Sequence, residues 1–121
     1  MHLPDFIDHT HLKPTATLSE IQYLCKEAKR FGFHAVCVNG CHVSLASEEL
    51  KNTKVKIAAV VGFPLGAMST EAKIFEAKDC VKNGADEIDT RYPQENAGEI
   101  RMEIMRVFRV VGVPSWLPRK Q

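Results

Sequence analysis

The amino-acid sequence predicts an α/β fold in which about four strand–helix units build one parallel sheet. Short runs of β-branched residues alternate with longer segments whose apolar residues recur every three or four positions. The third β-type run, residues 54–61, is almost continuously apolar, as expected of a strand covered on both faces. With 121 residues, 45% of them hydrophobic, the chain can bury one modest core, so we expect a single domain.

The first unit is expected to begin with a strand at residues 5–10. Thr17 and Glu20 then have the spacing of a capping box, in which a hydroxyl and a carboxylate satisfy the free amides at a helix start. Gly32 should end this helix, since glycine tolerates the positive φ found at helix C-termini. The helix carries one apolar stripe, formed by Ile21, Leu24, Cys25, Ala28 and Phe31.

The next three strands are expected at residues 34–39, 54–61 and 86–90, with helices at residues 43–50 and 70–82 between them. In the second of these helices, the residues expected to face the sheet are Ile74, Ala77 and Val81. The loop after the third strand contains two glycines and a proline, which let a backbone approach a ligand closely. It has no Walker or dinucleotide-binding pattern, so nucleotide binding is not expected.

The pattern changes after residue 90. Residues 91–94 break the alternation, and Asn96 is placed to cap an amphipathic helix. Its apolar side would consist of Ile100, Ile104, Val107, Phe108 and Val111. We therefore expect one domain, residues 1–121, in which residues 5–90 form the α/β part and residues 91–121 form a divergent helical tail.

Charge and hydropathy exclude several function classes. Sixteen Lys and Arg against fifteen Asp and Glu give a net charge of +1, so no basic field is available to hold a nucleic acid backbone. No segment approaches the roughly 20 consecutive apolar residues of a membrane-spanning helix. The N-terminal residues also lack the basic and apolar regions of a signal peptide. We expect a cytoplasmic protein without nucleic acid or membrane partners.

The four cysteines are expected to be free thiols, because disulfides rarely persist in the cytoplasm. Cys25 and Cys80 fall on apolar helix faces and should pack as small hydrophobic residues. Cys37, Cys41 and His42 resemble part of a zinc motif, but no second close pair of Cys or His follows at a zinc-binding spacing. We expect neither a metal nor a cofactor.

Polar residues on the strands supply the candidate site. Alternation along the strands places Asp8, Cys37 and Asp89 on the side of the sheet facing away from the helices, inside a barrel-like interior. Inward carboxylates are costly unless they are paired or used, so these residues are candidate ligand contacts. Structural alternatives remain open: Asp8 can bond backbone amides, and Cys37 can be a core residue.

Other polar residues near the strands have more ordinary interpretations. Glu87 either joins the site or forms an ion pair at the bottom of a barrel. His9 and His11 are expected to pack and to form hydrogen bonds between the first strand and the first helix. Lys13 and Lys73 lie near the C-terminal ends of strands, where an anionic ligand would bind, although solvated ammonium groups are the expectation.

Four sequence strings together closely resemble the first half of bacterial deoxyribose-phosphate aldolase, over about residues 5–89. They are IDHTHLKP at residues 7–14, AVCVN at 35–39, VVGFPLG at 60–66 and GADEID at 84–89. The resemblance implies half of a TIM (β/α)8 barrel. The family consists of class I aldolases, which cleave 2-deoxyribose 5-phosphate to glyceraldehyde 3-phosphate and acetaldehyde through a lysine Schiff base. It further implies that Asp89 is the proton-relay residue and that Asp8 and Cys37 line the sugar-phosphate pocket.

The chain also departs from this family. A complete barrel typically takes about 250 residues, and the family's Schiff-base lysine lies on the sixth strand in a Val-Lys-Thr-Ser-type motif that has no counterpart here. The loops that hold the substrate phosphate belong to the same half. We therefore expect a truncated aldolase-like lyase with little or no activity. The alternatives are a non-catalytic, self-associating half-barrel and a binder of small molecules or metals that uses the cysteines and histidines.

Half a barrel has an open strand edge on each side and an uncovered inner face, which is a liability in a monomer. We therefore expect a homo-oligomer. A second copy would pair along the open edges, or the tail would cover the exposed face through Val107, Phe108, Val111 and Trp116.

Overall fold

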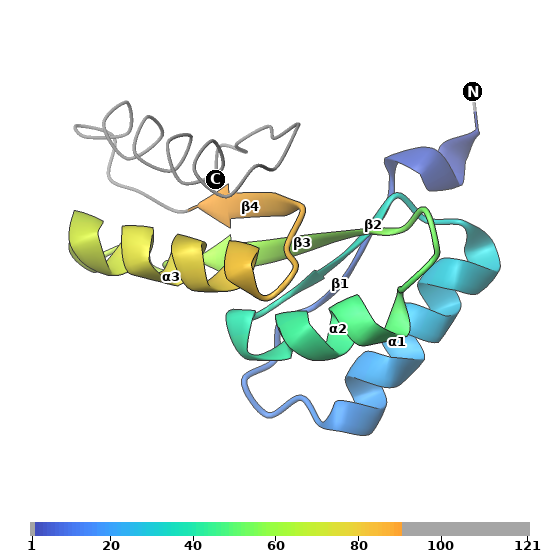
Figure 1. The fold of residues 1–121 in the computed structure, drawn as a ribbon, viewed down its shortest axis with the longest axis horizontal. Coiled ribbons are helices and arrows are strands. Elements are labelled where there is room, and N and C mark those ends of the chain that lie inside the picture. Colours follow the sequence, from blue (N-terminus) through green and yellow to red (C-terminus); the bar gives the residue numbers. More distant parts are fainter. Residues whose placement is uncertain (1, 91–121) are drawn as a thin grey trace.

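A computed structural model describes residues 2–90 and forms one four-stranded sheet with its helices on one face (Figure 1). The expected tail helix lies outside the described residues, as do the tail residues proposed to cover the sheet. The elements in chain order are η1 (Leu3–Phe6), β1 (Asp8–His11), α1 (Leu18–Phe31), β2 (Ala35–Val38), η2 (Gly40–His42), α2 (Val43–Glu49), β3 (Lys56–Val61), α3 (Thr70–Lys82) and β4 (Glu87–Thr90).

The four strands are all parallel and lie in the order β1-β2-β3-β4. Each helix therefore connects neighbouring strands, which confirms the expected α/β architecture of consecutive strand–helix units. The register aligns Thr10, Cys37, Ala58 and Glu87 across the sheet. These residues and Asp89 lie on the face opposite the helices, which we call the inner face.

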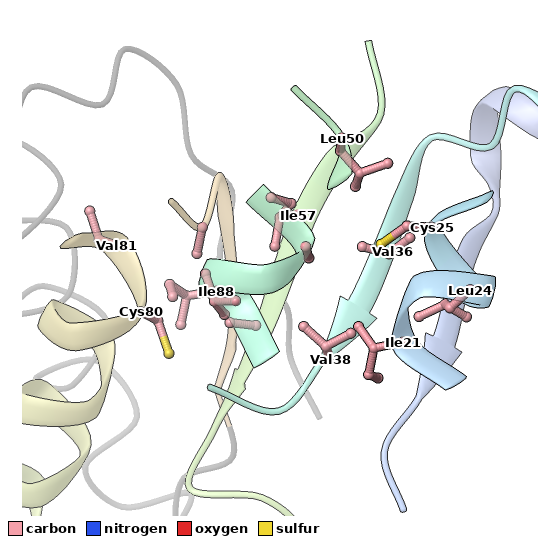
Figure 2. Packing of buried hydrophobic residues seen from close by; sticks show 14 of the residues in the cluster. Ile21, Leu24, Cys25, Val36, Val38, Leu50, Ile57, Cys80, Val81 and Ile88 are labelled. Carbon is pink, nitrogen blue, oxygen red and sulfur yellow. The ribbon is translucent and has the colours of Figure 1, made fainter. Parts of the chain in front are cut away.

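The main core lies between the sheet and the three α-helices (Figure 2). Alternate strand residues point into it, because side chains of a strand alternate between faces. The fully buried strand residues in this core are Val36, Val38, Ala59, Val61 and Ile88. A second, smaller cluster on the inner face consists of Cys37, Ala58 and Val60, with Leu12 packed against it.

Local signals at the first helix act as the sequence predicts. The Thr17 hydroxyl accepts a hydrogen bond from the Glu20 amide, and the Glu20 carboxylate accepts one from the Thr17 amide. Gly32 ends the helix with φ of 68°, a left-handed conformation that favours glycine. This capping box and this glycine explain why α1 begins and ends where it does.

The first strand differs from the expectation, because β1 begins at Asp8 and not at residue 5. Leu3–Phe6 forms a 3-10 turn instead, with Pro4 in its first turn. Proline has its φ fixed near the helical value and lacks the N–H that a strand would use, so it suits a helical start. Within residues 2–90, no helix combines the length and apolar character needed to cross a membrane.

The inward face of α3 also differs from the expectation. Its buried residues are Lys73, Ala77, Cys80 and Val81, whereas Ile74 is only partly buried. The first three follow a spacing of four and then three, which is an unbroken stripe along one side of a helix. The three predicted residues all contact the core, Ile74 from a partly buried position, and Lys73 is buried in addition to them.

Candidate functional site

Two of the three candidate site residues meet on the inner face. The Cys37 thiol lies 3.7 Å from Asp89 Oδ2, and both side chains are buried. Cys37 comes from β2 and Asp89 from β4, so the contact spans the intervening strand β3. Between them on the inner face of β3 lie Ala58 and Val60, whose small size leaves the two polar side chains room to approach. The expected convergence of Cys37 and Asp89 is present in the structure.

Asp8 joins a different group. Ligand atoms of Asp8, His34 and Glu87 all lie within 4.8 Å of one another, and all three residues are partly buried. Within this group the His34 ring lies 3.0 Å, Nε2 to Oε2, from the Glu87 carboxylate. Of the two interpretations of Glu87, the structure favours a polar contact at the N-terminal end of its strand, with His34 as the partner.

Sequence reasoning missed His34 as a member of any site. His34 precedes β2, so alternation along the strand does not fix the direction of its side chain. The signal that could have found it is positional. In a parallel sheet, the residues that begin the strands all lie at the same end of the sheet. Asp8 and Glu87 begin β1 and β4, and His34 directly precedes β2.

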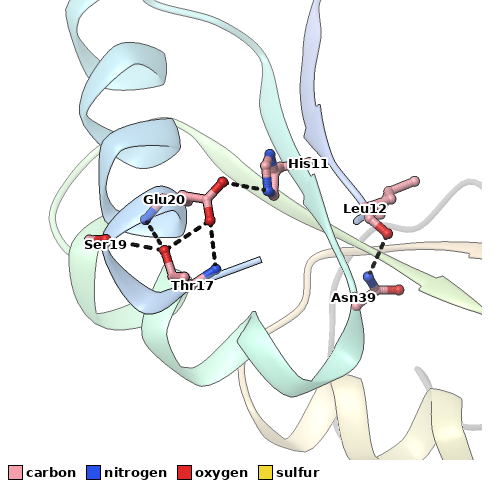
Figure 3. Close-up of polar contacts among 6 residues, drawn as sticks. All are labelled: His11, Leu12, Thr17, Ser19, Glu20 and Asn39. Carbon is pink, nitrogen blue, oxygen red and sulfur yellow. Dashed lines mark hydrogen bonds and ion pairs between the residues drawn. The ribbon is translucent and has the colours of Figure 1, made fainter. Parts of the chain in front are cut away.

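The two histidines of β1 contact carboxylates of α1. His9 Nε2 lies 3.0 Å from Glu27 Oε1, and His11 Nε2 lies 3.5 Å from Glu20 Oε2. Figure 3 shows His11 beside Glu20, whose carboxylate also caps α1. The predicted strand-to-helix hydrogen bond is confirmed for His9, whereas His11 lies near the Glu20 carboxylate without a hydrogen bond to it.

Lys73 contradicts the expectation of a solvated ammonium group. Its side chain is fully buried, and its Nζ has no hydrogen-bond partner within the part of the chain that the structure describes. Burial lowers the pKa of this amine below its usual range, because a charged group loses its hydration there. Lys73 lies in the first turn of α3, a helix that packs on the face of the sheet opposite Cys37 and Asp89. Lys13 is exposed, as expected.

The cysteines are free thiols, as predicted. Cys25 and Cys80 are buried within the main core, where burial raises the pKa of the Cys25 thiol to about 11 and that of Cys80 to about 12. These two side chains therefore act as small hydrophobic residues. Cys41 is exposed, and among the described residues the suggested cluster of Cys37, Cys41 and His42 does not form.

Hydrogen bonds stabilise the loops at the C-terminal ends of the strands. Asn39 donates from Nδ2 to the Leu12 carbonyl at 3.1 Å and so ties the end of β2 to the end of β1 (Figure 3). The Gly62 amide donates to Glu76 Oε1 at 2.7 Å, which ties the glycine-containing loop to α3. The sheet end at which parallel α/β folds bind ligands is thus held in place by one side chain that follows β2 and one side chain of α3.

Comparisons with known proteins agree with this geometry. The chain is 57% identical over 89 residues to the deoxyribose-phosphate aldolase of Thermoanaerobacter pseudethanolicus, and 60% identical over 87 residues to that of Aciduliprofundum boonei. The matches lie in the N-terminal three quarters of this chain. The chain is a homologue of deoxyribose-phosphate aldolase. No family model matches it.

Solved aldolase structures share the fold. The tetrameric deoxyribose phosphate aldolase of Aeropyrum pernix superposes with a TM-score of 0.81 at 27% identity, and an aldolase called QR15 with 0.78 at 34%. These alignments cover 98% and 97% of this chain, but only 51% and 53% of those structures. The chain likewise spans about 40% of the two curated deoxyribose-phosphate aldolases, covering 74% and 72% of its own length. The described sheet therefore corresponds to about half of an aldolase TIM barrel.

Proposed function

We propose that these 121 residues build the first four strand–helix units of a deoxyribose-phosphate aldolase barrel and supply part of its sugar-phosphate pocket. The observation that carries this proposal is the buried contact of 3.7 Å between Cys37 and Asp89 on the inner face, in a chain 57% identical to such an aldolase. We further propose that the whole chain is one cytoplasmic domain without nucleic acid or membrane partners.

The family resemblance suggests a role for each inner-face residue. Asp89 would relay protons, because a carboxylate enclosed at a strand end can exchange a proton with a bound substrate without competition from bulk water. Cys37 would pack against the substrate and hydrogen-bond Asp89. Asp8 would line the same pocket, at its N-terminal side, where the structure groups it with Glu87 and His34.

We also propose that this chain by itself carries out little or no retro-aldol cleavage. The reaction needs an unprotonated lysine amine, which attacks the sugar carbonyl and forms an imine with loss of water. Lys13 is exposed, Lys56 is exposed at the N-terminal end of β3, and Lys73 is on the helix-covered side of the sheet. None of these three positions offers an amine beside Cys37 and Asp89.

A retro-aldol assay tests this proposal. The purified chain is incubated with 2-deoxyribose 5-phosphate, and released acetaldehyde is measured with a coupled dehydrogenase. We expect no cleavage above the protein-free blank, whereas the aldolase of Thermoanaerobacter pseudethanolicus at equal concentration cleaves the substrate. Cleavage by this chain that disappears in the Asp89→Asn variant would show that a complete catalytic site is present.

A second candidate function is self-association without catalysis. β1 and β4 are the edges of the described sheet, and the three α-helices cover only one of its faces (Figure 1). Pairing β4 of one copy with β1 of another, twice around a two-fold axis, would close eight parallel strands into a barrel. This assembly would shield both open edges and the inner face.

A further inference from the structure

A three-residue cluster of metal-ligand type lies at the N-terminal side of the sheet. It combines Asp8 at the start of β1, His34 directly before β2 and Glu87 at the start of β4. The three residues come from separate segments of the chain, so the fold and not the local sequence brings them together. Two carboxylates and one imidazole are a donor set that suits zinc and similar first-row divalent cations.

The distances within the cluster are close to those of a coordination sphere. Zinc binds carboxylate oxygen and imidazole nitrogen at about 2.0–2.2 Å in tetrahedral sites, so two of its ligand atoms lie about 3.4 Å apart. The three ligand atoms here lie within 4.8 Å of one another, and His34 Nε2 is 3.0 Å from Glu87 Oε2. The His34–Glu87 separation is thus near that of a zinc site, and the ligand atoms that lie farther apart would have to move closer on binding.

Electrostatics also favours a cation here. The cluster sets two carboxylates beside one imidazole, so a divalent ion placed among them would have the charge opposite to that of both carboxylates. The two histidines of β1 each face only one carboxylate: His9 faces Glu27, and His11 faces Glu20. Among the described residues, only Asp8, His34 and Glu87 form a cluster of this kind.

Solvent reaches the cluster through a surface pocket. A cavity of about 480 Å³ is lined partly by His34, with His2 and Asp5 of the N-terminal segment and with Lys29, Lys54 and Lys56. The His34 side chain is 36% exposed, whereas that of Glu87 is 19% exposed. The imidazole is therefore reachable from solvent, but the lysines do not attract a cation to the pocket, so binding must come from the three ligand residues themselves.

We propose that Asp8, His34 and Glu87 form a binding site for one divalent cation of the zinc type. The ion would be held by one imidazole nitrogen and two carboxylate oxygens, with water as the fourth ligand. It would join β1, the segment before β2 and β4, and so stabilise the sheet across its width. This site does not depend on aldolase activity.

Zinc titration of the full chain tests this site. The protein is first dialysed against a chelator, and zinc chloride is then titrated calorimetrically near neutral pH. We expect one zinc ion per chain and a loss of affinity of about tenfold or more in the His34→Ala and Asp8→Asn variants. The matched control is His9→Ala, because His9 also lies 3.0 Å from a carboxylate and is similarly exposed, but has only one such partner. It should bind zinc as the wild type does.

Two results would overturn the site: no zinc binding by the wild type, or unchanged binding in both variants. Loss of binding in Cys37→Ser or Cys41→Ser would do the same, since it would assign the ion to thiolates. If the His34 and Asp8 variants fail to fold by circular dichroism, cobalt bound to the wild type decides. Visible cobalt bands without a thiolate charge-transfer band support the site, and a thiolate band contradicts it.

Discussion

At the scale of single residues, Lys73 is the side chain that departs most from ordinary behaviour. A fully buried ammonium group without a hydrogen-bond partner among residues 2–90 loses its hydration and gains nothing in return. Its position in the first part of α3 adds to the cost, because the positive end of the helix dipole disfavours a cation. We therefore expect Lys73 to destabilise the folded chain.

Replacing Lys73 with methionine should raise the free energy of unfolding. Methionine has a similar length and fills the same space without a charge, and an unsatisfied buried donor costs on the order of 1–3 kcal/mol. Urea denaturation of Lys73→Met against the wild type measures the gain. The control is Lys78→Met, because Lys78 is exposed on the same helix and its replacement should change stability little.

The difference in the free energy of unfolding between Lys73→Met and the wild type should also depend on pH. Because burial lowers the pKa of Lys73 in the folded state, the unfolded chain binds more protons between the lowered pKa and the ordinary lysine pKa of 10.5. Wild-type stability therefore rises with pH in that range, and the advantage of Lys73→Met should shrink as pH approaches 10.5. An advantage that stays constant or grows with pH would mean that Lys73 is not desolvated in the folded protein.

The site residues show what alternation along strands can and cannot predict. Cys37 and Asp89 meet because each lies inside a strand, where the period of two determines the face. Asp8 lies on the expected face, but it is grouped with His34 and Glu87 and not with Cys37 and Asp89. Alternation could not predict the contact with His34, because His34 lies just before the first residue of β2. The burial of Lys73 could not be predicted, because the buried side of a helix is inferred from its apolar residues and Lys73 carries a charge.

At the scale of elements, the best-predicted feature is the start of α1. Thr17 and Glu20 satisfy each other's backbone amides, and both contacts are local in sequence, so they could be recognised without knowledge of the fold. The start of β1 could not be predicted in the same way. Residues 5 and 6 were read as part of the strand, but Pro4 favours the 3-10 turn that they enter.

Loss of the capping hydroxyl should destabilise α1 measurably. The Thr17→Ala variant leaves the Glu20 amide without its side-chain acceptor, and such changes cost about 1 kcal/mol. Thermal and urea unfolding measure the loss. Ser19→Ala is the control, since Ser19 lies beside Thr17 but does not cap the helix, and it should cost clearly less. Equal losses in the two variants would mean that the capping box does not stabilise α1.

At the scale of the whole molecule, the described part of the chain is a parallel sheet covered by helices on one face only. The alignment with about half of two solved aldolases is in keeping with this asymmetry, because the strands of a complete TIM barrel enclose a packed interior. The α/β class could be predicted from the repeated strand–helix units, whereas the half-barrel architecture followed from the resemblance to deoxyribose-phosphate aldolase. How this chain shields its inner face could not, because that depends on contacts beyond residues 2–90.

Self-association is the expected consequence of the open edges. Light scattering coupled to gel filtration should give a mass at least twice that of one chain at micromolar concentrations, with the mass falling on dilution. A charged substitution on the β1 edge, Thr10→Lys, should reduce association, because Thr10 is exposed on an edge strand. A monomeric mass at every concentration in the micromolar range would contradict the self-association proposal.

The central claim is that this chain carries aldolase pocket residues without the amine that forms the imine. Borohydride trapping tests it most directly: the chain is treated with 2-deoxyribose 5-phosphate and borohydride, and its intact mass is measured. We predict an unchanged mass, while the aldolase of Thermoanaerobacter pseudethanolicus acquires one reduced sugar adduct under the same conditions. A stoichiometric adduct on any lysine of this chain, Lys73 included, would contradict the claim.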